Sequence, residues 1–380
     1  MDQKTFSLRS EHFFWVDAIR GIAAICVVVF HYHHFYLADA FGRSSLPDTS
    51  TFPYAKLLNP LYLHGHLAVE LFWVISGFVF AHVYLSRPVT ARNFISARIA
   101  RLFPLHLAML FFVAGLQFVS MESVGHWQIY GNNDLRHFML NLGMASQWST
   151  WSRGLSFNGP IWSVSLEVGA YVMFFVSLFL LRSLGIWMAI VLAVLCFLLG
   201  SSGISLPLVR LSLFMCASFF FAGTVAYFLH IYIGNRGYLT VILIASLLLI
   251  GVLSVATGNE RISVMSFSSA LLIFAAMLDR IGAIGKWILS SLKALGNLSY
   301  SIYLVHVPLQ MILLLWFDMF FDQSRAFAES YMTLPIYLLI VVLVSSLVHV
   351  HFERPAGRYL RRRLSQQGQL EVSAETKPLS

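Results

Sequence analysis

The sequence predicts an all-α protein that crosses a membrane about ten times, with both termini in the cytoplasm. Composition, the spacing of apolar segments and the placement of basic residues support this fold class. Of the 380 residues, 58% are hydrophobic and 11% are charged, and the mean hydropathy is +0.75. Soluble domains carry roughly 45–50% apolar and about 25% charged residues. The composition therefore excludes a disordered chain, a secreted disulfide scaffold and a soluble enzyme with a single membrane anchor.

Apolar segments long enough to cross a bilayer, which takes about 20 residues, follow one another along the chain. We expect them near 13–37, 65–86, 102–121, 160–181, 184–201, 207–231, 238–256, 262–279, 296–317 and 332–352. The longest polar stretches, 38–64 and 122–159, should lie on one side. Within the second, the apolar residues of DLRHFMLNLGMASQW recur every three to four positions, which predicts a short helix at the membrane interface.

The basic residues predict the orientation. If the N-terminus is inside, 18 of the 25 Lys and Arg residues fall on the inner side and 7 on the outer side. Under the positive-inside rule, this bias fits an even number of spans with both termini inside. These basic residues lie at intervals between the apolar segments and form no continuous patch in the sequence, which argues against a nucleic-acid partner. We expect one membrane domain over residues 1–355 and a basic, then polar, cytoplasmic tail over 356–380 that is disordered. The basic tail, RYLRRRL, should contact anionic lipid headgroups or fix the topology.

Ionisable residues at membrane depth are the candidates for function, because a charge there is costly unless it faces a polar cavity or a partner. The first span contains Asp17, Arg20 and His31. Arg20 and His31 are eleven residues apart, which places them on nearly the same stripe of a helix and roughly 16 Å apart along its axis. We expect them to face one common cavity. The alternative is that Arg20 extends to the inner interface and His31 is an interfacial histidine.

Later spans add Glu70, Glu167 and His306. Glu70 is either an acidic residue favoured at a helix N-terminus or a cavity group that partners a cation. Glu167 lies deeper in its apolar segment, where the helix dipole explains it less well. His306 precedes the helix-bending Pro308 by two positions and is either a hydrogen-bonded structural residue or part of the chemistry.

Arg98 and Arg101 lie one helical turn apart before the third span. This spacing puts both guanidinium groups on one helix face, where they can bind phosphate oxygens through two hydrogen bonds each. The alternative is ordinary inner-side positive charge, which Lys would supply equally well.

Six ordered segments resemble the acyltransferase-3 family of membrane O-acetyltransferases, which act on bacterial polysaccharides, Nod factors and some antibiotics. They are DAIRGIAAICVVVFH, VELFWVISGF, RIARLFPLH, NGPIWSVSLE, GNLSYSIYLVH and HFERP, spanning residues 17 to 355. Glu70 stands where the family more often has Asp, and Trp73 where it more often has Phe. No SGNH hydrolase domain follows the last span, so we expect the membrane part to complete the transfer or to hand over to a separate protein.

The resemblance implies a function and a site. Acetyl-CoA, or another acyl-CoA, would be the co-substrate and would bind Arg98 and Arg101 from the cytoplasm. His31 would be the general base for an acceptor hydroxyl, with Arg20, Glu70 and Glu167 as further catalytic candidates and either Glu orienting the imidazole. The matched segments also supply candidates for the substrate cavity, which are Asp17, Trp162, Ser163, Tyr300, Tyr303 and His306. The resemblance places the protein in the cytoplasmic membrane of a bacterium.

Several alternatives remain open at this stage. Direct transfer is the simpler mechanism, although an acyl-enzyme is an alternative. The acceptor could be a surface polysaccharide, a lipid-linked precursor, peptidoglycan or a secreted glycoside, and the acyl group and oligomeric state are also open. No metal is expected, because the histidines around HYHH lack a fixed ligand spacing and Cys26, Cys196 and Cys216 lie singly in apolar segments. The rival function is a polytopic transporter or flippase, although repeated halves or paired broken helices are absent.

Overall fold

The computed structural model describes residues 12–37, 48–151, 154–282, 286–321 and 325–375. These residues form helices joined by turns and loops, with no strand among them. Within them, nine helical segments are long and apolar enough to cross a membrane, and one shorter apolar helix, α7 (Ile186–Ser201), accompanies them. The predicted all-α, polytopic fold class is therefore confirmed.

The candidate membrane spans and the shorter helix α7 follow the predicted order. They are α1 (Phe14–Phe30), α2 (Ala55–His64) continuing through the 3-10 turn η4 (Gly65–Leu67) into α3 (Ala68–Tyr84), α4 (Ala91–Val124), α6 (Ile161–Leu184), α7, α8 (Leu211–Ile233), α9 (Gly237–Ala256), α10 (Glu260–Ile281), α11 (Lys286–Phe320) and α12 (Thr333–Val348). The smaller elements are the 3-10 turns η2 (His31–Tyr36), η3 (Thr49–Thr51) and η5 (Ala326–Glu329), the helix α5 (Leu135–Leu142), the π-helical turn η6 (His349–Glu353) and the last helix, α13 (Arg354–Glu375).

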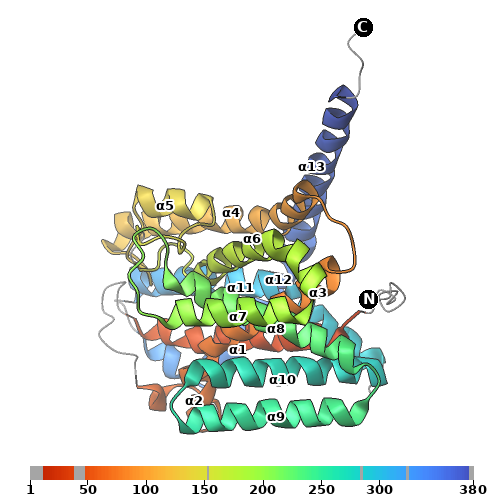
Figure 1. Cartoon of the computed structure of the whole chain (residues 1–380). Coiled ribbons are helices and arrows are strands. Elements are labelled where there is room, and N and C mark those ends of the chain that lie inside the picture. The colour runs from red at the N-terminus through yellow and green to blue at the C-terminus, as the bar shows by residue number, and fades with distance from the viewer. Residues whose placement is uncertain (1–11, 38–47, 152–153, 283–285, 322–324, 376–380) are drawn as a thin grey trace.

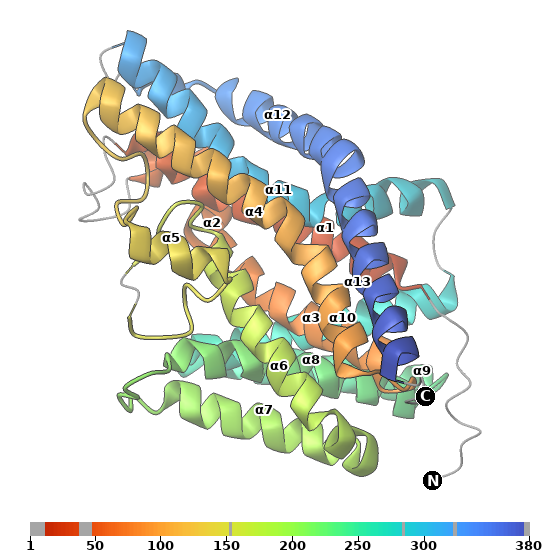
Figure 2. The ribbon, with the colours of Figure 1, turned by 90° about the horizontal axis from the view of Figure 1, so that it is seen from above.

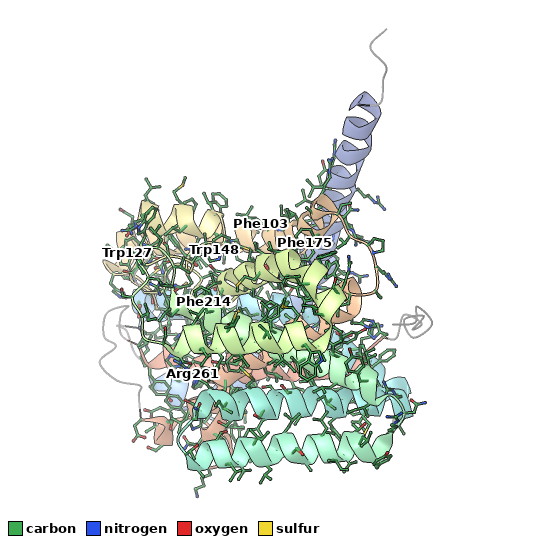
Figure 3. All side chains as sticks on the ribbon, viewed as in Figure 1. Phe103, Trp127, Trp148, Phe175, Phe214 and Arg261 are labelled. Carbon is green, nitrogen blue, oxygen red and sulfur yellow. The ribbon has the colours of Figure 1, made fainter. Side chains whose placement is uncertain are left out.

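The helices run side by side between two ends of the molecule (Figure 1). The start of α1 and the projecting helix α13 lie at the same end of the molecule (Figures 1 and 2). Trp127 and Arg261, both predicted on the outer side, lie at the opposite end (Figure 3). An even number of crossings produces this arrangement. Which end faces the cytoplasm stays a prediction.

Close backbone contacts join the central helices. Helix α1 packs against α11 and α3, and α3 packs against α8, while Figure 2 shows α4, α11 and α12 side by side. A Cβ atom on Gly77 of α3 would overlap the carbonyl oxygen of Phe220, and one on Gly223 of α8 would overlap that of Val74. Small residues allow helices to approach closely in a bilayer, where association depends on packing and hydrogen bonds.

Helix α4 begins well before the predicted span at 102–121. Its first residue is Ala91, and the side chain of Thr90 accepts a hydrogen bond from the backbone N–H of Asn93 at 3.3 Å, as N-cap residues do. A hydropathy window misses this part because its residues are polar although they favour a helix. Arg98 and Arg101 therefore lie about two turns inside α4 and not at its start.

Helix α13 occupies most of the segment that we expected to be a disordered tail. Residues 354–375 continue the helix of α12 through η6 and project beyond the bundle (Figure 1). Gly357 allows α13 to approach α4, since a Cβ there would lie 2.8 Å from the carbonyl oxygen of Ala100. Arg92 Nη2 also donates to the Leu364 carbonyl at 3.4 Å. Packing on α4 thus supports a helix that composition alone did not predict.

The short helix predicted in the loop at 122–159 is α5, which begins at Leu135 and ends at Leu142. Asp134 caps it by accepting a hydrogen bond of 2.9 Å from the backbone N–H of His137. This hydrogen bond lowers the pKa of the Asp134 carboxyl from its ordinary value. The helix itself is confirmed, and its place at the membrane interface stays a prediction.

Candidate active site

A cavity of about 170 Å³ lies between α1, α3, α4, α6 and α11. Its walls carry three guanidinium groups, from Arg20, Arg98 and Arg101, and one carboxylate, from Glu167. The remaining lining residues are Phe72, Trp73, Ile75, Ser76, Val79, Phe80, Leu102, Ser163, Val164, Tyr171, Ser299, Tyr300 and Tyr303. The excess of positive charge favours an anionic ligand.

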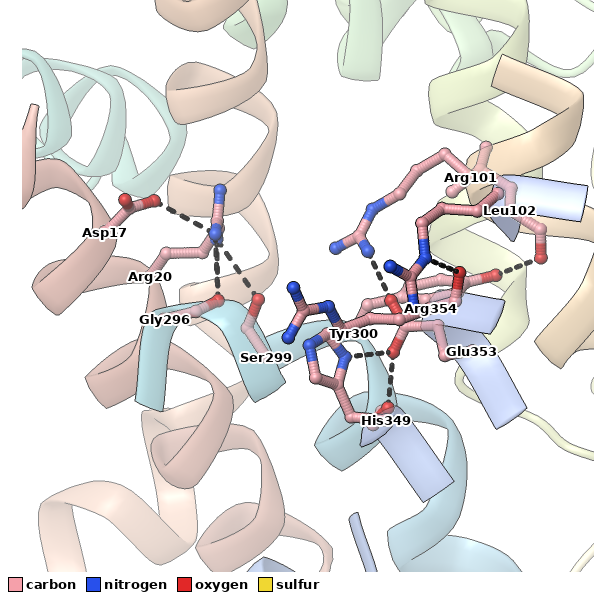
Figure 4. A network of polar contacts seen from close by, with 12 residues as sticks. Asp17, Arg20, Arg101, Leu102, Gly296, Ser299, Tyr300, His349, Glu353 and Arg354 are labelled. Atoms are coloured by element: carbon pink, nitrogen blue, oxygen red, sulfur yellow. Dashed lines mark hydrogen bonds and ion pairs between the residues drawn. The ribbon is translucent and has the colours of Figure 1, made fainter. Parts of the chain in front are cut away.

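Arg20 is held against α11 by hydrogen bonds and an ion pair (Figure 4). Its Nη2 lies 2.8 Å from the carbonyl oxygen of Gly296 and 3.0 Å from Asp17 Oδ1, and its Nε donates to Ser299 Oγ at 3.1 Å. Glycine permits this contact, because a Cβ on Gly21 would lie 2.9 Å from the Gly296 nitrogen. Arg20 is thus a fixed cation on the cavity wall. Asp17 neutralises part of its charge from outside the cavity lining.

Arg101 is held by Glu353, a residue that sequence reasoning did not select. The Glu353 side chain is 4% exposed and forms an ion pair with Arg101 (Figure 4). Its Oε2 accepts hydrogen bonds from Ser301 Oγ at 2.5 Å and from His349 Nδ1 at 2.9 Å. Glu353 and His349 belong to the π-helical turn η6, a type of turn often found at functional sites. The one signal for Glu353 was its place in the matched segment HFERP.

Arg98 has different surroundings. Its guanidinium carbon lies 4.8 Å from the ring centroid of Phe80 and 5.9 Å from those of Tyr84 and Tyr171. The Arg98 Nε is buried and has no hydrogen-bond partner among the described residues. Buried donors are rarely left unsatisfied in native proteins. A bound anion in the cavity would therefore complete the hydrogen bonding of Arg98 more readily than that of Arg101.

Glu167 is the acidic residue on the cavity wall. Its Oε1 accepts hydrogen bonds from Ser76 Oγ and, at 2.6 Å, from the Tyr171 hydroxyl. The sequence analysis missed both donors. Ser76 lies on α3, and nothing in the spacing connects α3 with α6. Tyr171 lies one turn after Glu167 on α6 itself, a spacing that places the two side chains on one helix face. With its carboxylate bound in this way, Glu167 offsets part of the positive charge of the cavity.

The cavity wall is aromatic also at the end formed by the start of α3, about two turns before Phe80. The Tyr303 hydroxyl donates to the carbonyl oxygen of Pro160 at 3.0 Å and lies 2.7 Å from Ser163 Oγ. The Phe72 ring lies 6.0 Å from that of Tyr303. Trp73 also lines this end and packs edge-on against Trp162, with ring centroids 5.9 Å apart.

Of the remaining cavity candidates, Tyr300 lines the wall beside Arg101, whose guanidinium carbon lies 5.4 Å from its ring centroid. The Tyr300 hydroxyl donates to the carbonyl oxygen of Leu102 at 2.6 Å (Figure 4). Trp162 packs against Trp73 and is not among the described residues that line the cavity.

His31 lies at the end of α1, in a separate histidine cluster. Its Nδ1 is 3.0 Å from the carbonyl oxygen of Val27 and 3.1 Å from His306 Nε2, and Gln310 Nε2 donates to the His31 carbonyl at 2.8 Å. His31 and Arg20 thus both contact α11. Arg20 lines the cavity, whereas His31 is not among its described lining residues. Tyr303 also lines the cavity, and its ring lies 6.1 Å from the His306 imidazole. That Arg20 and His31 face one common cavity stays a prediction.

Neither candidate carboxylate orients His31. Within the described part of the chain, Glu70 and Glu167 form no hydrogen bond with His31. The Glu70 Oε2 is buried and has no hydrogen-bond partner among the described residues. The prediction failed because helix periodicity places a residue on a face of its own helix but does not say which neighbouring helix packs there. His306 of α11 occupies the place that we expected a glutamate to fill.

The histidines of the HYHH segment cluster at the end of α1. The ring centroid of His31 lies 6.0 Å from that of His33 and 4.9 Å from that of His34, and the centroids of His64 and His66 are 6.5 Å apart. Among the described residues, no group of three or more His, Cys, Asp or Glu side chains is arranged to hold a metal ion.

Pro308 leaves a backbone carbonyl of α11, near His306, able to accept a hydrogen bond from another segment. Proline has no N–H, so the carbonyl oxygen of Leu304, four residues earlier, lacks its helical donor. Asn158 Nδ2 donates to this oxygen at 2.8 Å. Asn158 follows Phe157, which has a positive φ of 49°, an uncommon backbone conformation for a bulky residue. The sequence analysis missed Asn158, although it lies in the matched segment NGPIWSVSLE.

The fold and site define a multi-pass membrane protein that combines a buried, cationic cavity with a nearby pair of histidines. The profile of the family described as "Acyltransferase domain" matches residues 13–350, nearly the whole chain. The chain therefore belongs to the acyltransferase-3 family.

One relative matches a shorter region of the chain. The chain is 36% identical over 108 residues to "Protein 2 in picA locus" of Rhizobium radiobacter. The match covers 27% of the chain and 45% of that protein, so the chain spans less than half the length of this relative. No solved structure matches the chain.

Proposed function

We propose that the protein transfers an acetyl group from cytoplasmic acetyl-CoA to a hydroxyl of a cell-envelope or exported carbohydrate, in the cytoplasmic membrane of a bacterium. The observation that carries this proposal is the cavity in which three guanidinium groups face one carboxylate. In a membrane acyltransferase, a cationic cavity suits a donor that carries several phosphate groups. Acyl-CoA is such a donor.

Arg98 is the principal phosphate ligand in this proposal. Its Nε has no hydrogen-bond partner among the described residues, and its aromatic neighbours shield it from water, which strengthens an ion pair. Arg101 adds a second guanidinium one turn further along α4, oriented by Glu353. Arg20 supplies a third cation, fixed by Asp17 and Gly296. The phosphates would bind at this cationic wall and the acyl group would point toward the aromatic end of the cavity.

His31 is the general base in the proposed reaction. As its imidazole takes the proton of the acceptor hydroxyl, the hydroxyl oxygen attacks the carbonyl carbon of the thioester. The carbon–sulfur bond then breaks, and the departing CoA thiolate takes the proton back from the imidazolium. The products are an O-acyl ester and free CoA, with no acyl-enzyme. Tyr303 lines the cavity with its ring 6.1 Å from that of His306, which contacts His31, so we expect the thioester to approach His31 past the Tyr303 side chain.

The location of His31 supports a carbohydrate acceptor outside the cytoplasm. His31 ends α1 at the end of the bundle opposite to α13, which is the outer end in the predicted orientation. A hydroxyl acceptor could approach there while the charged donor stays on the cytoplasmic side. The acceptor and the donor would thus use opposite ends of the protein.

The direct test compares the O-acyl content of surface glycans in cells with and without the protein, and in cells with a His31→Ala variant at equal abundance. We expect ester content to fall on removal, and the variant to match the cells that lack the protein, because general-base catalysis typically contributes 10²–10⁴-fold. If less glycan reached the surface while the ester content per glycan was unchanged, the protein would be a transporter. Unchanged glycan and unchanged ester would also contradict the proposal.

A further inference from the structure

We propose that His306 is a positioning residue that fixes the proton of His31 on Nδ1 and leaves the lone pair on Nε2. This inference rests on the proposed role of His31 as the general base. It goes further by naming the nitrogen that acts and the side chain that selects it.

The tautomer of His306 follows from its own helix. Its Nδ1 lies 3.0 Å from the carbonyl oxygen of Ile302, one turn earlier in α11. A carbonyl oxygen only accepts hydrogen bonds, so Nδ1 must carry a proton. The side chain is 0% exposed, and burying a charged imidazolium without a counter-ion is costly. His306 is therefore neutral, with its lone pair on Nε2.

The tautomer of His31 follows from that of His306. His31 Nδ1 lies 3.1 Å from His306 Nε2 and 3.0 Å from the carbonyl oxygen of Val27. Both neighbours are acceptors. A lone pair on His31 Nδ1 would face two other lone pairs, so this nitrogen carries the proton and the basic nitrogen is Nε2.

Gln310 of α11 also contacts the segment that contains His31. One turn after His306, its Nε2 donates to the His31 carbonyl at 2.8 Å and its Oε1 accepts from His34 Nδ1 at 2.8 Å. The α11 helix thus contacts both the backbone and the ring of His31. When His31 takes a proton on Nε2, its Nδ1–H donor becomes charged, and charge-assisted hydrogen bonds are about twice as strong as neutral ones. His306 therefore favours the state of His31 that follows proton transfer.

Three substitutions separate this role from a general packing role. In His306→Gln, the amide oxygen can take the place of Nε2 and accept from His31, whereas the shorter side chain of His306→Asn reaches only the place of Nδ1. His306→Leu removes both contacts. We expect kcat for acetyl transfer to fall at least about tenfold in the Leu and Asn variants, with KM for acetyl-CoA unchanged, and to recover within a few-fold in the Gln variant.

A control variant tests whether the loss of any buried histidine lowers kcat. His106 is 2% exposed and binds the carbonyl oxygen of Asn141 through Nε2 at 2.7 Å. His106→Leu therefore removes a buried histidine from another helix, and we expect kcat to stay within a few-fold of the parent. Equal kcat in His306→Asn and His306→Gln would overturn the proposal, as would a parent-like kcat in His306→Leu.

A spectroscopic readout tests the tautomer without any substrate. The ¹⁵N shifts of labelled histidine distinguish protonated from unprotonated ring nitrogens in the full-length protein, and the His31→Ala variant assigns the His31 signals. We expect a proton on Nδ1 of His31 in the parent and a measurable population with the proton on Nε2 in His306→Leu. A parent tautomer with the proton on Nε2, or an unchanged tautomer in His306→Leu, would contradict the proposal. Because this readout needs no turnover, absence of acetyl transfer would count against the proposed function alone.

Discussion

Arg98 and Arg101 lie one turn apart on α4, but the structure gives them different neighbours. Arg101 pairs with Glu353, whereas the Arg98 guanidinium lies over the ring of Phe80. The spacing in the sequence predicts a common helix face but contains no information on what packs against it. Sequence reasoning therefore selected both residues but could not tell that Glu353 holds one of them.

The two arginines should respond differently to substitution by lysine. Arg98→Lys keeps the charge but loses the planar fork that binds two phosphate oxygens, so we expect KM for acetyl-CoA to rise about tenfold with a smaller change in kcat. Arg101→Lys should raise KM less, because a lysine can still pair with Glu353. Steady-state kinetics in membranes with equal protein content measure both effects.

Arg92 supplies the matched control on the same helix. It lies outside the cavity lining and donates to the Leu364 carbonyl, so Arg92→Lys should leave KM unchanged. If Arg98→Lys behaved like Arg92→Lys, the donor phosphates would have to bind elsewhere, with Arg20 as the next candidate.

Trp73 should limit the length of the acyl group. It lines the aromatic end of the cavity, is 4% exposed, and is packed against Trp162 and against Phe219, whose ring centroid lies 6.1 Å away. In Trp73→Leu the cavity gains room for a longer chain, and each added methylene in an apolar pocket is worth about 1–3 kcal/mol. We expect the ratio of kcat/KM for butyryl-CoA to that for acetyl-CoA to rise about tenfold.

The control for this prediction is Trp187→Leu. Trp187 is 73% exposed on α7 and outside the cavity, so its loss should leave the preference between the two donors unchanged. An unchanged preference in Trp73→Leu would place the acyl group in another part of the protein.

At the scale of helices, the sequence predicts where apolar segments lie better than where helices end. Hydropathy located the ten segments, but α4 and α11 extend beyond them because polar residues such as Arg98 and Lys293 continue the helix. The π-helical turn η6 and the Asn158 contact with α11 also escaped prediction. Both depend on contacts between residues far apart in the chain, which local periodicity does not encode.

The contact between α3 and α8 predicts a strong and local effect of one methyl group. Gly77→Ala would place a Cβ against the carbonyl oxygen of Phe220, so one backbone must move. Overpacking typically costs about 1–3 kcal/mol. We expect the midpoint of thermal unfolding in detergent, followed by tryptophan fluorescence, to fall by several degrees.

Gly115 is the control for this substitution. It lies in α4, and a Cβ there would have nothing within 4 Å, so Gly115→Ala should leave the midpoint unchanged or raise it slightly, since Ala is favoured over Gly in a helix by about 0.5–1 kcal/mol. Equal midpoints for the two alanine variants would show that α3 and α8 do not approach as closely as described.

At the scale of the whole molecule, the guanidinium groups of the cavity and His31 lie at different positions along the helices. The cationic cavity involves Arg98 and Arg101, about two turns from the start of α4, and His31 lies at the far end of α1. Tyr303 lines the cavity, and its ring lies 6.1 Å from the imidazole of His306, which contacts His31. This arrangement suits an enzyme that takes a charged donor on one side of a membrane and acylates a hydroxyl on the other. A soluble acyltransferase has no need for such a separation.

The central claim is tested most directly by supplying labelled acetyl-CoA to one face at a time of sealed vesicles of known orientation, with an acceptor glycan on the opposite face. Because 18 of the 25 basic residues fall on the predicted inner side and the donor is anionic, we expect labelled ester only when acetyl-CoA is on the cytoplasmic face. His31→Ala vesicles with equal protein should form at least about 100-fold less ester. Ester formation only from donor on the outer face would contradict the account.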